Sequence, residues 1–376
     1  MQESMPHDNG PYLIIAQSGR ALAASAHKAG IQTHVIDRFA DTDTKQYALT
    51  TRVVNGDETK ICVDHLESLL ADFNPRQIKG VVTGSGFENQ PEILNELDEH
   101  FTLLGNKAEC VKTCKDPALF FPLLESLGIP YPEISLQPLN KQDGWLVKKT
   151  GGSGGQHIFW ADDSNLPQNH YYQKYINGRT ISVTFVANGS DINIIGLNET
   201  WIIGADNNYT FVGAITLPEV KTQIKKALFE IVKLLTDQIN LLGLCGMDVI
   251  VDKNNNCYVL EINPRPVSTF ELYDKKGHLF NAHIEACEGQ LIKTGSHDKN
   301  ISRGFEIKYL INDFIVPDIS WPDWTTDRPA KGLKIASGEP ICTIHAAASS
   351  SEETRELLDQ RIVILNKLLG LEKIAA

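Results

Sequence analysis

The sequence has no excess of basic residues. Its 376 residues include 35 Lys and Arg against 47 Asp and Glu, for a formal net charge of -12. Because contacts to nucleic-acid phosphates require clustered Lys and Arg, this balance argues against general nucleic-acid binding. We therefore expect partners among small molecules, with no nucleic acid.

Long apolar runs and metal-type cysteine pairs are also missing. No run approaches the length of a membrane span, so no membrane partner is expected, and residues 1–7 lack the pattern of a signal peptide. The seven cysteines are an odd number without metal-type spacing, which fits a reducing cytoplasm. With 42% apolar and 22% charged residues, the chain is expected to form a globular protein of two or three domains.

The glycine fingerprint of a dinucleotide site is absent as well. Residues 12–16 and 31–36 are predicted strands around a helix at 21–29, a β-α-β unit. Only Gly19 stands where G-x-G-x-x-G needs three glycines, so a dehydrogenase is disfavoured. We expect a doubly wound, Rossmann-like domain whose loops touch substrate. The loop at 84–89 is a candidate lip of the substrate site, with a plain tight turn as the alternative.

What the sequence does contain is an acidic hairpin. Two short apolar strands flank a polar turn at 252–256. Glu261 and Asn263 lie two apart on the second strand and project to one face, where an antiparallel partner can bring Asp248 beside them. Two carboxylates and an amide oxygen suit Mg²⁺ that keeps some of its waters and binds nucleotide phosphates. Arg265 falls on the same side and adds a fork for an anionic group.

A surface hairpin whose acids face water is the alternative. The apolar run at 258–260 disfavours it, because a carboxylate that follows a strand about to be buried needs a partner.

A second motif is a glycine-rich turn. A predicted strand delivers Lys148, and the turn follows as Gly151, Gly152, Ser153, Gly154 and Gly155. Four glycines let backbone N–H groups fold over phosphate oxygens without a Cβ in the way. The pattern is not a Walker A loop, and alone it fits a flexible hairpin equally well.

Together, these pieces resemble the ATP-grasp superfamily. Lys148 with its glycine turn comes first, then the strand at 171–183, then the acidic hairpin. The overall layout resembles the predicted ATP-dependent carboligases related to biotin carboxylase. The resemblance implies a multidomain α/β and α+β fold. Its parts are a Rossmann-like domain at 1–107, an ATP-grasp domain at 108–300 (nucleotide lobe about 108–178, metal-binding lobe about 179–300), and a β-rich cap with a C-terminal helix at 301–376.

The resemblance also implies roles for single residues. Lys115 and Lys148 would reach the nucleotide phosphates, and Lys112 is an alternative to Lys115 because Lys115-Asp116 reverses the usual order. For Lys115, the structural alternative is a solvated lysine at a helix end. For the strand at 171–183, it is a plain edge strand. The implied adenine contacts are Gln173, Tyr175 and Ile176, the metal ligands are Asp248, Glu261 and Asn263, and the catalytic residues are Arg265 and Lys148. His157 and His345 are expected to be packed or solvated.

The implied reaction is an ADP-forming ligation. Mg-ATP phosphorylates a carboxylate, and an amine displaces phosphate from the acyl phosphate to give an amide. Phosphoryl transfer asks the protein mainly for alignment and charge neutralisation. ATP and Mg²⁺ are the expected cofactors, with Mn²⁺ as a second candidate metal.

The resemblance leaves the biological setting and two other functions open. It suggests small-molecule or cofactor biosynthesis, and a homodimer is one candidate assembly. The alternatives are a bicarbonate-using carboxylase of the biotin-carboxylase or purine-pathway type and a non-catalytic nucleotide-binding protein.

Overall fold

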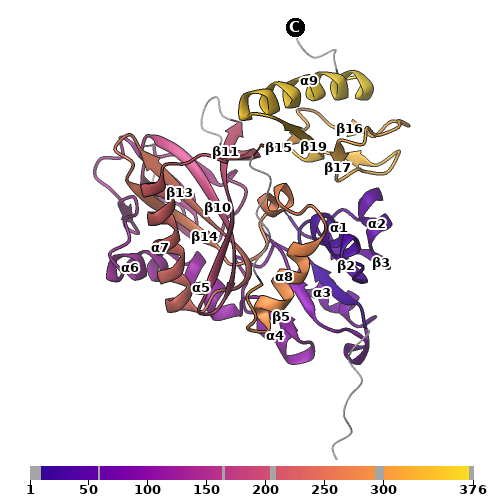
Figure 1. The fold of residues 1–376 in the computed structure, drawn as a ribbon, viewed down its shortest axis with the longest axis horizontal. Coiled ribbons are helices and arrows are strands. Elements are labelled where there is room, and N and C mark those ends of the chain that lie inside the picture. Colours follow the sequence, from indigo (N-terminus) through magenta and orange to yellow (C-terminus); the bar gives the residue numbers. More distant parts are fainter. Residues whose placement is uncertain (1–9, 58–59, 163–165, 204–208, 293–299, 372–376) are drawn as a thin grey trace, which may run out of the picture.

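The computed structural model describes residues 10–57, 60–162, 166–203, 209–292 and 300–371. Residues 1–7, for which no signal peptide was predicted, lie outside these ranges. Within them, helices combine with a parallel sheet near the N-terminus and antiparallel sheets further along the chain (Figure 1). The predicted multidomain α/β and α+β fold is thereby confirmed. No helix in the described part of the chain is long and apolar enough to cross a membrane.

The N-terminal sheet is parallel, with strand order β3-β2-β1-β4-β5. Its inner strands are continuous apolar runs because a parallel sheet is covered on both faces. The elements α2 and β3 were not predicted from the sequence, because both are short and mostly polar. The strands are β1 (Tyr12–Ile15), β2 (Thr33–Asp37), β3 (Thr50–Val53), β4 (Val81–Thr83) and β5 (Leu103–Leu104); the helices are α1 (Arg20–Lys28), α2 (Thr42–Tyr47), α3 (Val63–Leu70), η1 (Pro75–Gln77) and α4 (Ile93–His100).

Two short helices lead from this sheet to the next one. Asp116 ends α5 (Ala108–Lys115) and caps α6 (Pro117–Ser126), because its carboxylate accepts a hydrogen bond from the Ala118 N–H and Pro117 fits the first helical turn. An antiparallel sheet of order β6-β9-β7-β8 follows. Its strands are β6 (Ile134–Ser135), β7 (Trp145–Lys149), β8 (Ile158–Trp160) and β9 (His170–Lys174).

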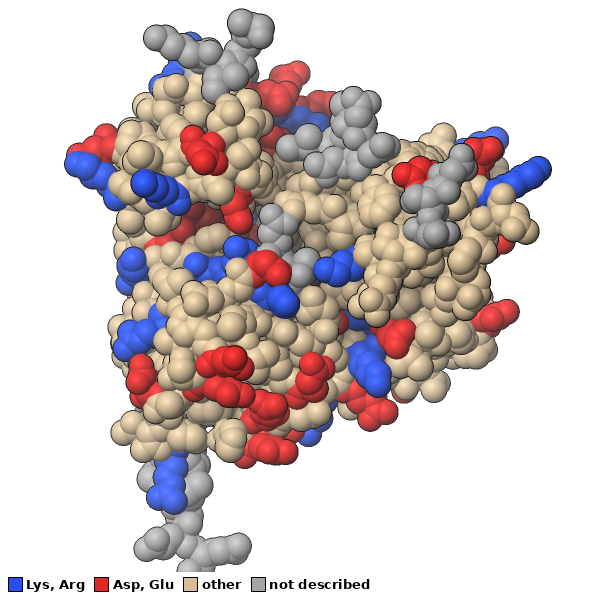
Figure 2. All heavy atoms as spheres, turned by 180° about the vertical axis from the view of Figure 1, so that it is seen from behind, with Lys and Arg blue, Asp and Glu red and all other residues tan. Residues whose placement is uncertain are grey.

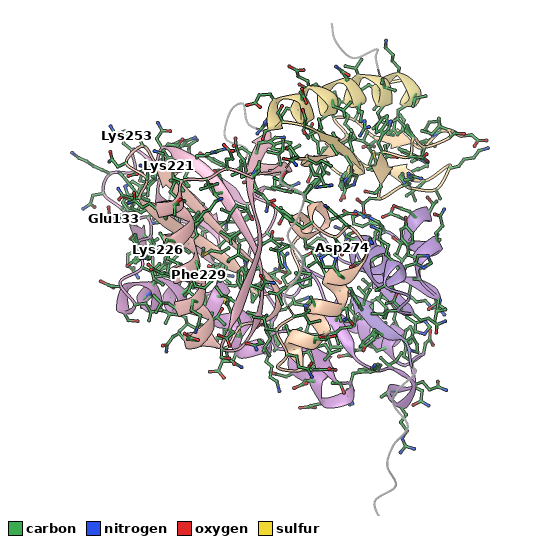
Figure 3. The ribbon with its side chains drawn as sticks, viewed as in Figure 1. Glu133, Lys221, Lys226, Phe229, Lys253 and Asp274 are labelled. Atoms are coloured by element: carbon green, nitrogen blue, oxygen red, sulfur yellow. The ribbon has the colours of Figure 1, made fainter. Side chains whose placement is uncertain are left out.

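The largest sheet has the strand order β14-β13-β10-β11-β12-β15-β19-β17. The helix α7 (Thr222–Ile239) buries one apolar face against it, while Lys226 and the 48% exposed Phe229 lie on its outer side (Figure 3). The strands are β10 (Gly178–Asn188), β11 (Ile192–Ile203), β12 (Thr210–Thr216), β13 (Leu242–Asp252), β14 (Cys257–Asn263), β15 (Ser302–Tyr309), β17 (Thr325–Thr326) and β19 (Pro340–Ala348).

Three of the strands beyond residue 301 belong to this large sheet. The strands β15, β17 and β19 extend it, and α9 (Ser351–Leu369) lies across them (Figure 1). In the described part of this region, β16 (Phe314–Ile315) and β18 (Lys334–Ile335) form a separate antiparallel pair. The strands that flank the turn at 337–340 therefore do not pair with each other. The predicted domain boundaries at 107 and 300 stay a prediction.

Between the N-terminal and the large sheet lie η2 (Ser268–Leu272) and α8 (His278–Cys287). The imidazole of His283 on α8 is fully enclosed, at 1% exposure. Its Nδ1 accepts a hydrogen bond from the Leu244 N–H at 2.8 Å, and its Nε2 lies 3.0 Å from the Leu104 carbonyl oxygen. One side chain thus links α8, β13 and β5.

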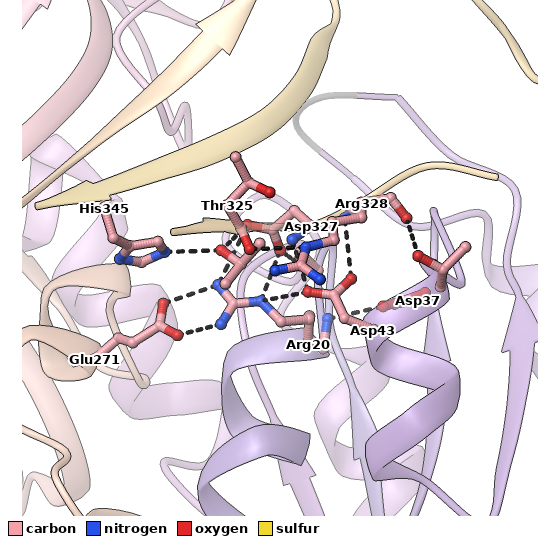
Figure 4. Close-up of polar contacts among 12 residues, drawn as sticks. Arg20, Asp37, Asp43, Glu271, Thr325, Asp327, Arg328 and His345 are labelled. Carbon is pink, nitrogen blue, oxygen red and sulfur yellow. Dashed lines mark hydrogen bonds and ion pairs between the residues drawn. The ribbon is translucent and has the colours of Figure 1, made fainter. Parts of the chain in front are cut away.

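A buried charge cluster ties three distant segments together (Figure 4). Arg20 at the start of α1 is 4% exposed. Its guanidinium pairs with both carboxylate oxygens of Glu271 on η2 and with Asp327, where Nε lies 3.0 Å from Oδ1. Asp43 on α2 accepts hydrogen bonds from the backbone N–H groups of Asp327 and Arg328 at 2.9 and 3.0 Å. These contacts fix the N-terminal segment, η2 and the C-terminal region relative to one another.

Candidate active site

A cleft opens between the end of α5, the first turn of α6, the strands β7 and β9, the glycine turn and β14. Five of the residues selected from the sequence line it: Lys115, Lys148, Gly151, Gly152 and Glu261. The other lining residues are Cys114, Pro117, Phe120, Phe121, Lys149, His157, Tyr171 and Leu260. Residues that are far apart in the sequence thus meet at one place.

The acidic hairpin forms as its pattern predicts. In the antiparallel pair β13–β14, Asp248 stands opposite Glu261, and a register shift directly beyond this pair leaves Leu260 without a partner on β13. The Asn263 amide Nδ2 donates to Asp248 Oδ2 at 3.1 Å and to Glu261 Oε1 at 3.3 Å. All three side chains therefore share one face, and their role as metal ligands stays a prediction.

Lys115 reaches into this group. Its ammonium donates to Glu261 Oε2 at 3.1 Å and to Asn263 Oδ1 at 2.7 Å, and the residue is only 8% exposed. Lys112, the alternative weighed from the sequence, is exposed and lies outside the cleft lining. The geometry thus brings Lys115 to the cleft.

The two carboxylates of the group differ in their proton affinity. Burial, and then the neighbouring charge of Glu261, raise the pKa of Asp248 to about 7. Burial alone would also raise the pKa of Glu261, but the ammonium groups of Lys115 and Lys148 hold it well below its ordinary value. At neutral pH Glu261 therefore carries the more firmly held negative charge.

Lys148 extends into the cleft from β7 and is 7% exposed. Its ammonium donates to Gln173 Oε1 at 3.3 Å, because Leu146 of β7 and Gln173 of β9 are paired in register and Lys148 lies two residues further along β7. Gln173 Nε2 is buried and has no hydrogen-bond partner within the described ranges. A buried donor of this kind is one that a ligand can satisfy.

The predicted adenine contacts divide into two groups. Gln173 lies beside Lys148, whereas Tyr175 is 42% exposed and packs on Trp160, with ring centroids 5.0 Å apart. Neither Tyr175 nor Ile176 lines the cleft. Its apolar wall comes instead from Phe120 and Phe121 on α6, from Tyr171 and from Leu260, which sequence reasoning did not select. The apolar run at 118–121 was the available signal.

The glycine turn is held against two other segments. Gly154 accepts a hydrogen bond through its carbonyl oxygen from the Phe211 N–H of β12 at 2.8 Å. Gly155 has φ +80°, and a Cβ there would lie 1.9 Å from the Tyr209 carbonyl oxygen. Gly151 has φ +68°, and a Cβ there would lie 2.8 Å from Cβ of Asn89. The turn therefore requires glycine at 151 and 155 for both conformation and space.

Arg265 contacts the N-terminal sheet's loop at 84–89. Its Nε donates to Glu88 Oε1 at 2.6 Å, and Glu88 Oε2 accepts from the Gly86 N–H at 2.7 Å. Burial would raise the pKa of Glu88, but the Arg265 guanidinium holds it below its usual value. Arg265 does not line the cleft itself, and its catalytic role stays a prediction. The loop that was expected to touch substrate thus contacts both Arg265 and the glycine turn.

The residues present fit a magnesium nucleotide. Two buried lysines and a glycine turn suit phosphate oxygens, the orphaned Gln173 amide can bond a base, and Asp248, Glu261 and Asn263 offer oxygen ligands. In the described part of the chain, no group of three or more His, Cys, Asp or Glu side chains is placed to hold a metal. The predicted set has only two such acids, which suits Mg²⁺ that takes its remaining ligands from phosphates and water.

Charged side chains of both signs lie on the face of the molecule shown in Figure 2. On the face shown in Figure 2, Asp and Glu are interspersed with Lys and Arg, and no extended basic patch appears.

Comparison with known proteins assigns the domain that contains this site. Residues 106–269 match the family model of the ATP-grasp domain. The chain therefore contains an ATP-grasp domain, and the superfamily resemblance drawn from the sequence is confirmed.

Two curated relatives differ in how much of their own length this chain covers. The carbamoyl phosphate synthase large chain of Agathobacter rectalis is 28% identical over 199 residues, which cover 46% of this chain and 18% of that protein. An uncharacterized protein of Methanocaldococcus jannaschii is 24% identical over 364 residues, covering 89% of this chain and 87% of the relative. The chain thus spans less than a fifth of the first relative and most of the second.

Solved structures share the fold over nearly the whole chain. The L-amino acid ligase from Bacillus licheniformis aligns with a TM-score of 0.69 and 13% identity, covering 94% of this chain and 97% of that one. The biotin carboxylase domain of Hydrogenobacter thermophilus 2-oxoglutarate carboxylase, in complex with MgADP and bicarbonate, has a TM-score of 0.69 and 13% identity, covering 93% and 88%. At these identities the likeness concerns the fold.

Proposed function

We propose that this chain is an ATP-dependent, ADP-forming ligase that joins a carboxylate to an amine through an acyl phosphate. The observation that carries the proposal is the single cleft in which Lys115, Lys148, the glycine turn and Glu261 meet. The ATP-grasp match and the MgADP bound by a protein of the same fold support it.

In this proposal each group has a task. Lys148 and Lys115 neutralise charge on the nucleotide phosphates, and the backbone N–H groups of the glycine turn bind phosphate oxygens. Asp248, Glu261 and Asn263 would hold Mg²⁺, which when bound would supply positive charge beside the phosphates. The Lys115 ammonium contacts both Glu261 and Asn263, so one positive charge already lies within this group.

Arg265 is proposed to orient the acceptor carboxylate. Its Nε is held by Glu88, and its Nη1 donates to the Pro266 carbonyl oxygen at 3.2 Å. A guanidinium fixed in this way can present the rest of its fork to a carboxylate without losing side-chain freedom on binding. The glycine turn and the loop at 84–89, which touch each other through Gly151 and Asn89, would then enclose the two reacting groups.

The direct test is ADP release by the purified chain with Mg-ATP and pooled candidate substrates. Release that needs both a carboxylate and an amine, with one phosphate released per amide formed, supports the ligase. Release that depends on bicarbonate instead would assign the carboxylase alternative, for which the bicarbonate bound by the Hydrogenobacter enzyme provides a precedent of the same fold. Nucleotide binding without turnover on any pool would point to the non-catalytic alternative.

The remaining expectations belong to the same proposal. We infer that the protein acts on small molecules in the cytoplasm, in small-molecule or cofactor biosynthesis. We also infer that Mn²⁺ can replace Mg²⁺. The assembly to test is a homodimer. All seven cysteines are free thiols in the structure, which supports a reducing compartment.

A further inference from the structure

A second pocket lies at the N-terminal sheet, away from the cleft. Its volume is about 580 Å³, within the range of pockets that hold small-molecule ligands. Its walls come from the beginnings of four parallel strands, at Pro11 before β1, His34 on β2, Thr50 on β3 and Lys79 before β4. The loop at 84–89, which contacts Arg265 and the glycine turn, follows the opposite end of β4. Among the described residues, none lines both the pocket and the cleft.

The charged side chains of this pocket are mostly basic, although the chain as a whole has a net charge of -12. Its described lining residues include one acid, Asp72, and three basic residues, Arg52, Arg76 and Lys79. The ion pair of Arg52 and Asp72 spans 3.9 Å between side chains 43% and 60% exposed, so it is weak. The pocket therefore carries positive charge that its own acid does not offset.

The two arginines can bind an anion directly. The Arg76 guanidinium forms neither an ion pair nor a hydrogen bond with the described residues, whereas its backbone N–H is held by Asn74 Oδ1 at 3.0 Å. Arg52 Nη1 donates to the Thr51 carbonyl oxygen at 3.2 Å, which leaves the other donors of its fork for a ligand. A guanidinium fork matches the two oxygens of a carboxylate or phosphate group.

A histidine and an aromatic ring form the wall beside these arginines. His34 and Thr50 stand opposite each other in the parallel pair β2–β3, and His34 Nδ1 lies 2.7 Å from Thr50 Oγ1. Phe73 packs on the His34 ring, with ring centroids 5.2 Å apart. His34 Nε2 has no hydrogen-bond partner among the described residues. This wall thus offers apolar surface to a carbon skeleton and one further hydrogen-bonding atom.

We propose that this pocket binds a small organic anion, whose phosphate or carboxylate group is held by Arg52 and Arg76. The carbon skeleton of the ligand would pack on Phe73 and on the His34 ring. The volume of the pocket admits a molecule of metabolite size. This second site does not depend on the proposed ligase function, because its described residues lie outside the cleft lining.

Calorimetry with glycerol 3-phosphate, succinate and uncharged glycerol tests the site. Each compound would be titrated into the wild-type chain, Arg76→Gln and Arg179→Gln, with and without a non-hydrolysable ATP analogue and Mg²⁺. Arg179 is the matched control, an arginine 49% exposed that lies outside the pocket. We expect the wild-type chain and Arg179→Gln to bind at least one of the two anions and not glycerol. In Arg76→Gln that affinity should fall about 10-fold or more, since a hydrogen bond to a charged group is worth about that factor.

Binding of glycerol 3-phosphate alone would assign the site to phosphates, and binding of succinate alone would assign it to carboxylates. His34 provides a second signal. Burial first, and then the charge of Arg52, lower the pKa of His34. A bound anion offsets that charge, so the pKa of His34, followed by NMR of the histidine rings, should rise when the anion is added.

Four results would overturn the assignment. They are no binding of either anion by the wild-type chain, equal affinity in Arg76→Gln and Arg179→Gln, binding that the ATP analogue abolishes, and an unchanged pKa of His34 in the presence of a bound anion. The third result would place the anion in the cleft.

Discussion

At the scale of single residues, the ion pair of Lys115 and Glu261 is the central feature of the cleft. Lys115 is buried, whereas the Glu261 side chain keeps 35% of its surface exposed. The pKa of Glu261 is also held well below its usual value, because the ammonium groups of Lys115 and Lys148 face it. Its charge therefore serves both the proposed metal site and the packing of Lys115.

Replacing Glu261 by Gln should separate these two contributions. We expect turnover to fall by ~10²-fold or more, comparable to losing one preorganised electrostatic group. Stability should fall by roughly 1–2 kcal/mol, less than the 3–5 kcal/mol of a fully buried pair because water screens the partly exposed Glu261. Rates of ADP release and urea unfolding on one preparation give both values.

Glu199→Gln is the matched control for this variant. Glu199 is similarly exposed, at 29%, and is also ion-paired, to Arg179 and Arg355, but it lies outside the cleft lining. Its replacement should leave turnover unchanged. A Glu261→Gln enzyme as active as the Glu199→Gln enzyme would remove Glu261 from the mechanism.

His283 should make the fold sensitive to mild acid. Burial lowers its pKa from 6.5 to about 4, so between these values the unfolded chain binds a proton that the folded chain does not. Stability is therefore complete above pH 6.5 and falls as the pH drops toward 4. The expected loss from this residue is about 3 kcal/mol, at 1.36 kcal/mol for each pKa unit.

Urea unfolding at a series of pH values measures how the stability changes with pH. His283→Gln should be less stable at pH 7 yet show a shallower decline toward pH 4 than the wild-type chain. His157, whose pKa is also lowered to about 4, contributes a decline of its own that the variant retains. An unchanged slope in His283→Gln would contradict the assignment.

At the scale of elements, the glycine turn offers a paired test. Gly154 and Gly155 both have positive φ, +70° and +80°, so an alanine at either costs about 1 kcal/mol in conformation. Among the described residues, only at Gly155 would the new Cβ meet another segment, at 1.9 Å from the Tyr209 carbonyl oxygen, whereas at Gly154 none of their atoms lies within 4 Å of it. Gly155→Ala should therefore release the turn from β12, and Gly154→Ala should not.

Hydrogen exchange at residues 151–156, with and without nucleotide, would reveal the difference. We expect faster exchange and about 10-fold lower turnover in Gly155→Ala than in Gly154→Ala, because a released turn holds the phosphates less well. Identical exchange and turnover in the two variants would mean that the contact with β12 has no role.

The elements themselves were largely predictable, and the reasons are local. The acidic hairpin followed from two apolar strands around a polar turn, and α9 from its apolar spacing. The aromatic cleft wall and the place of His157 in the cleft lining were not predictable, because each depends on which segments pack together. Nothing in the residues around Glu88 indicates that its partner is Arg265, 177 positions away.

At the scale of the whole molecule, the cluster around Arg20 joins parts that are more than 300 residues apart. Arg20 and Asp327 are separated by 307 positions, and no local pattern predicts such a pair. Arg20→Met would leave Glu271 and Asp327, with side chains only 18% and 23% exposed, without their shared cation. We expect a loss of about 3 kcal/mol in stability, at the lower end for a broken buried pair.

Arg52→Met provides the comparison for the Arg20 variant. Arg52 pairs with Asp72 at 3.9 Å, with side chains 43% and 60% exposed, and its loss should cost at most about 1 kcal/mol. Differential scanning calorimetry would compare both variants with wild type. If Arg20→Met melts like Arg52→Met, the cluster does not hold the C-terminal region in place.

The central claim is that one folded cleft binds a magnesium nucleotide. The most direct test is calorimetry with a non-hydrolysable ATP analogue, with and without Mg²⁺. The wild-type chain is compared with Lys148→Ala, and NADH is tested as a second class of ligand. We expect the analogue to bind more tightly with Mg²⁺, its affinity to fall about 10-fold or more in Lys148→Ala, and NADH not to bind. Tight binding of NADH with no response to the analogue would contradict this claim.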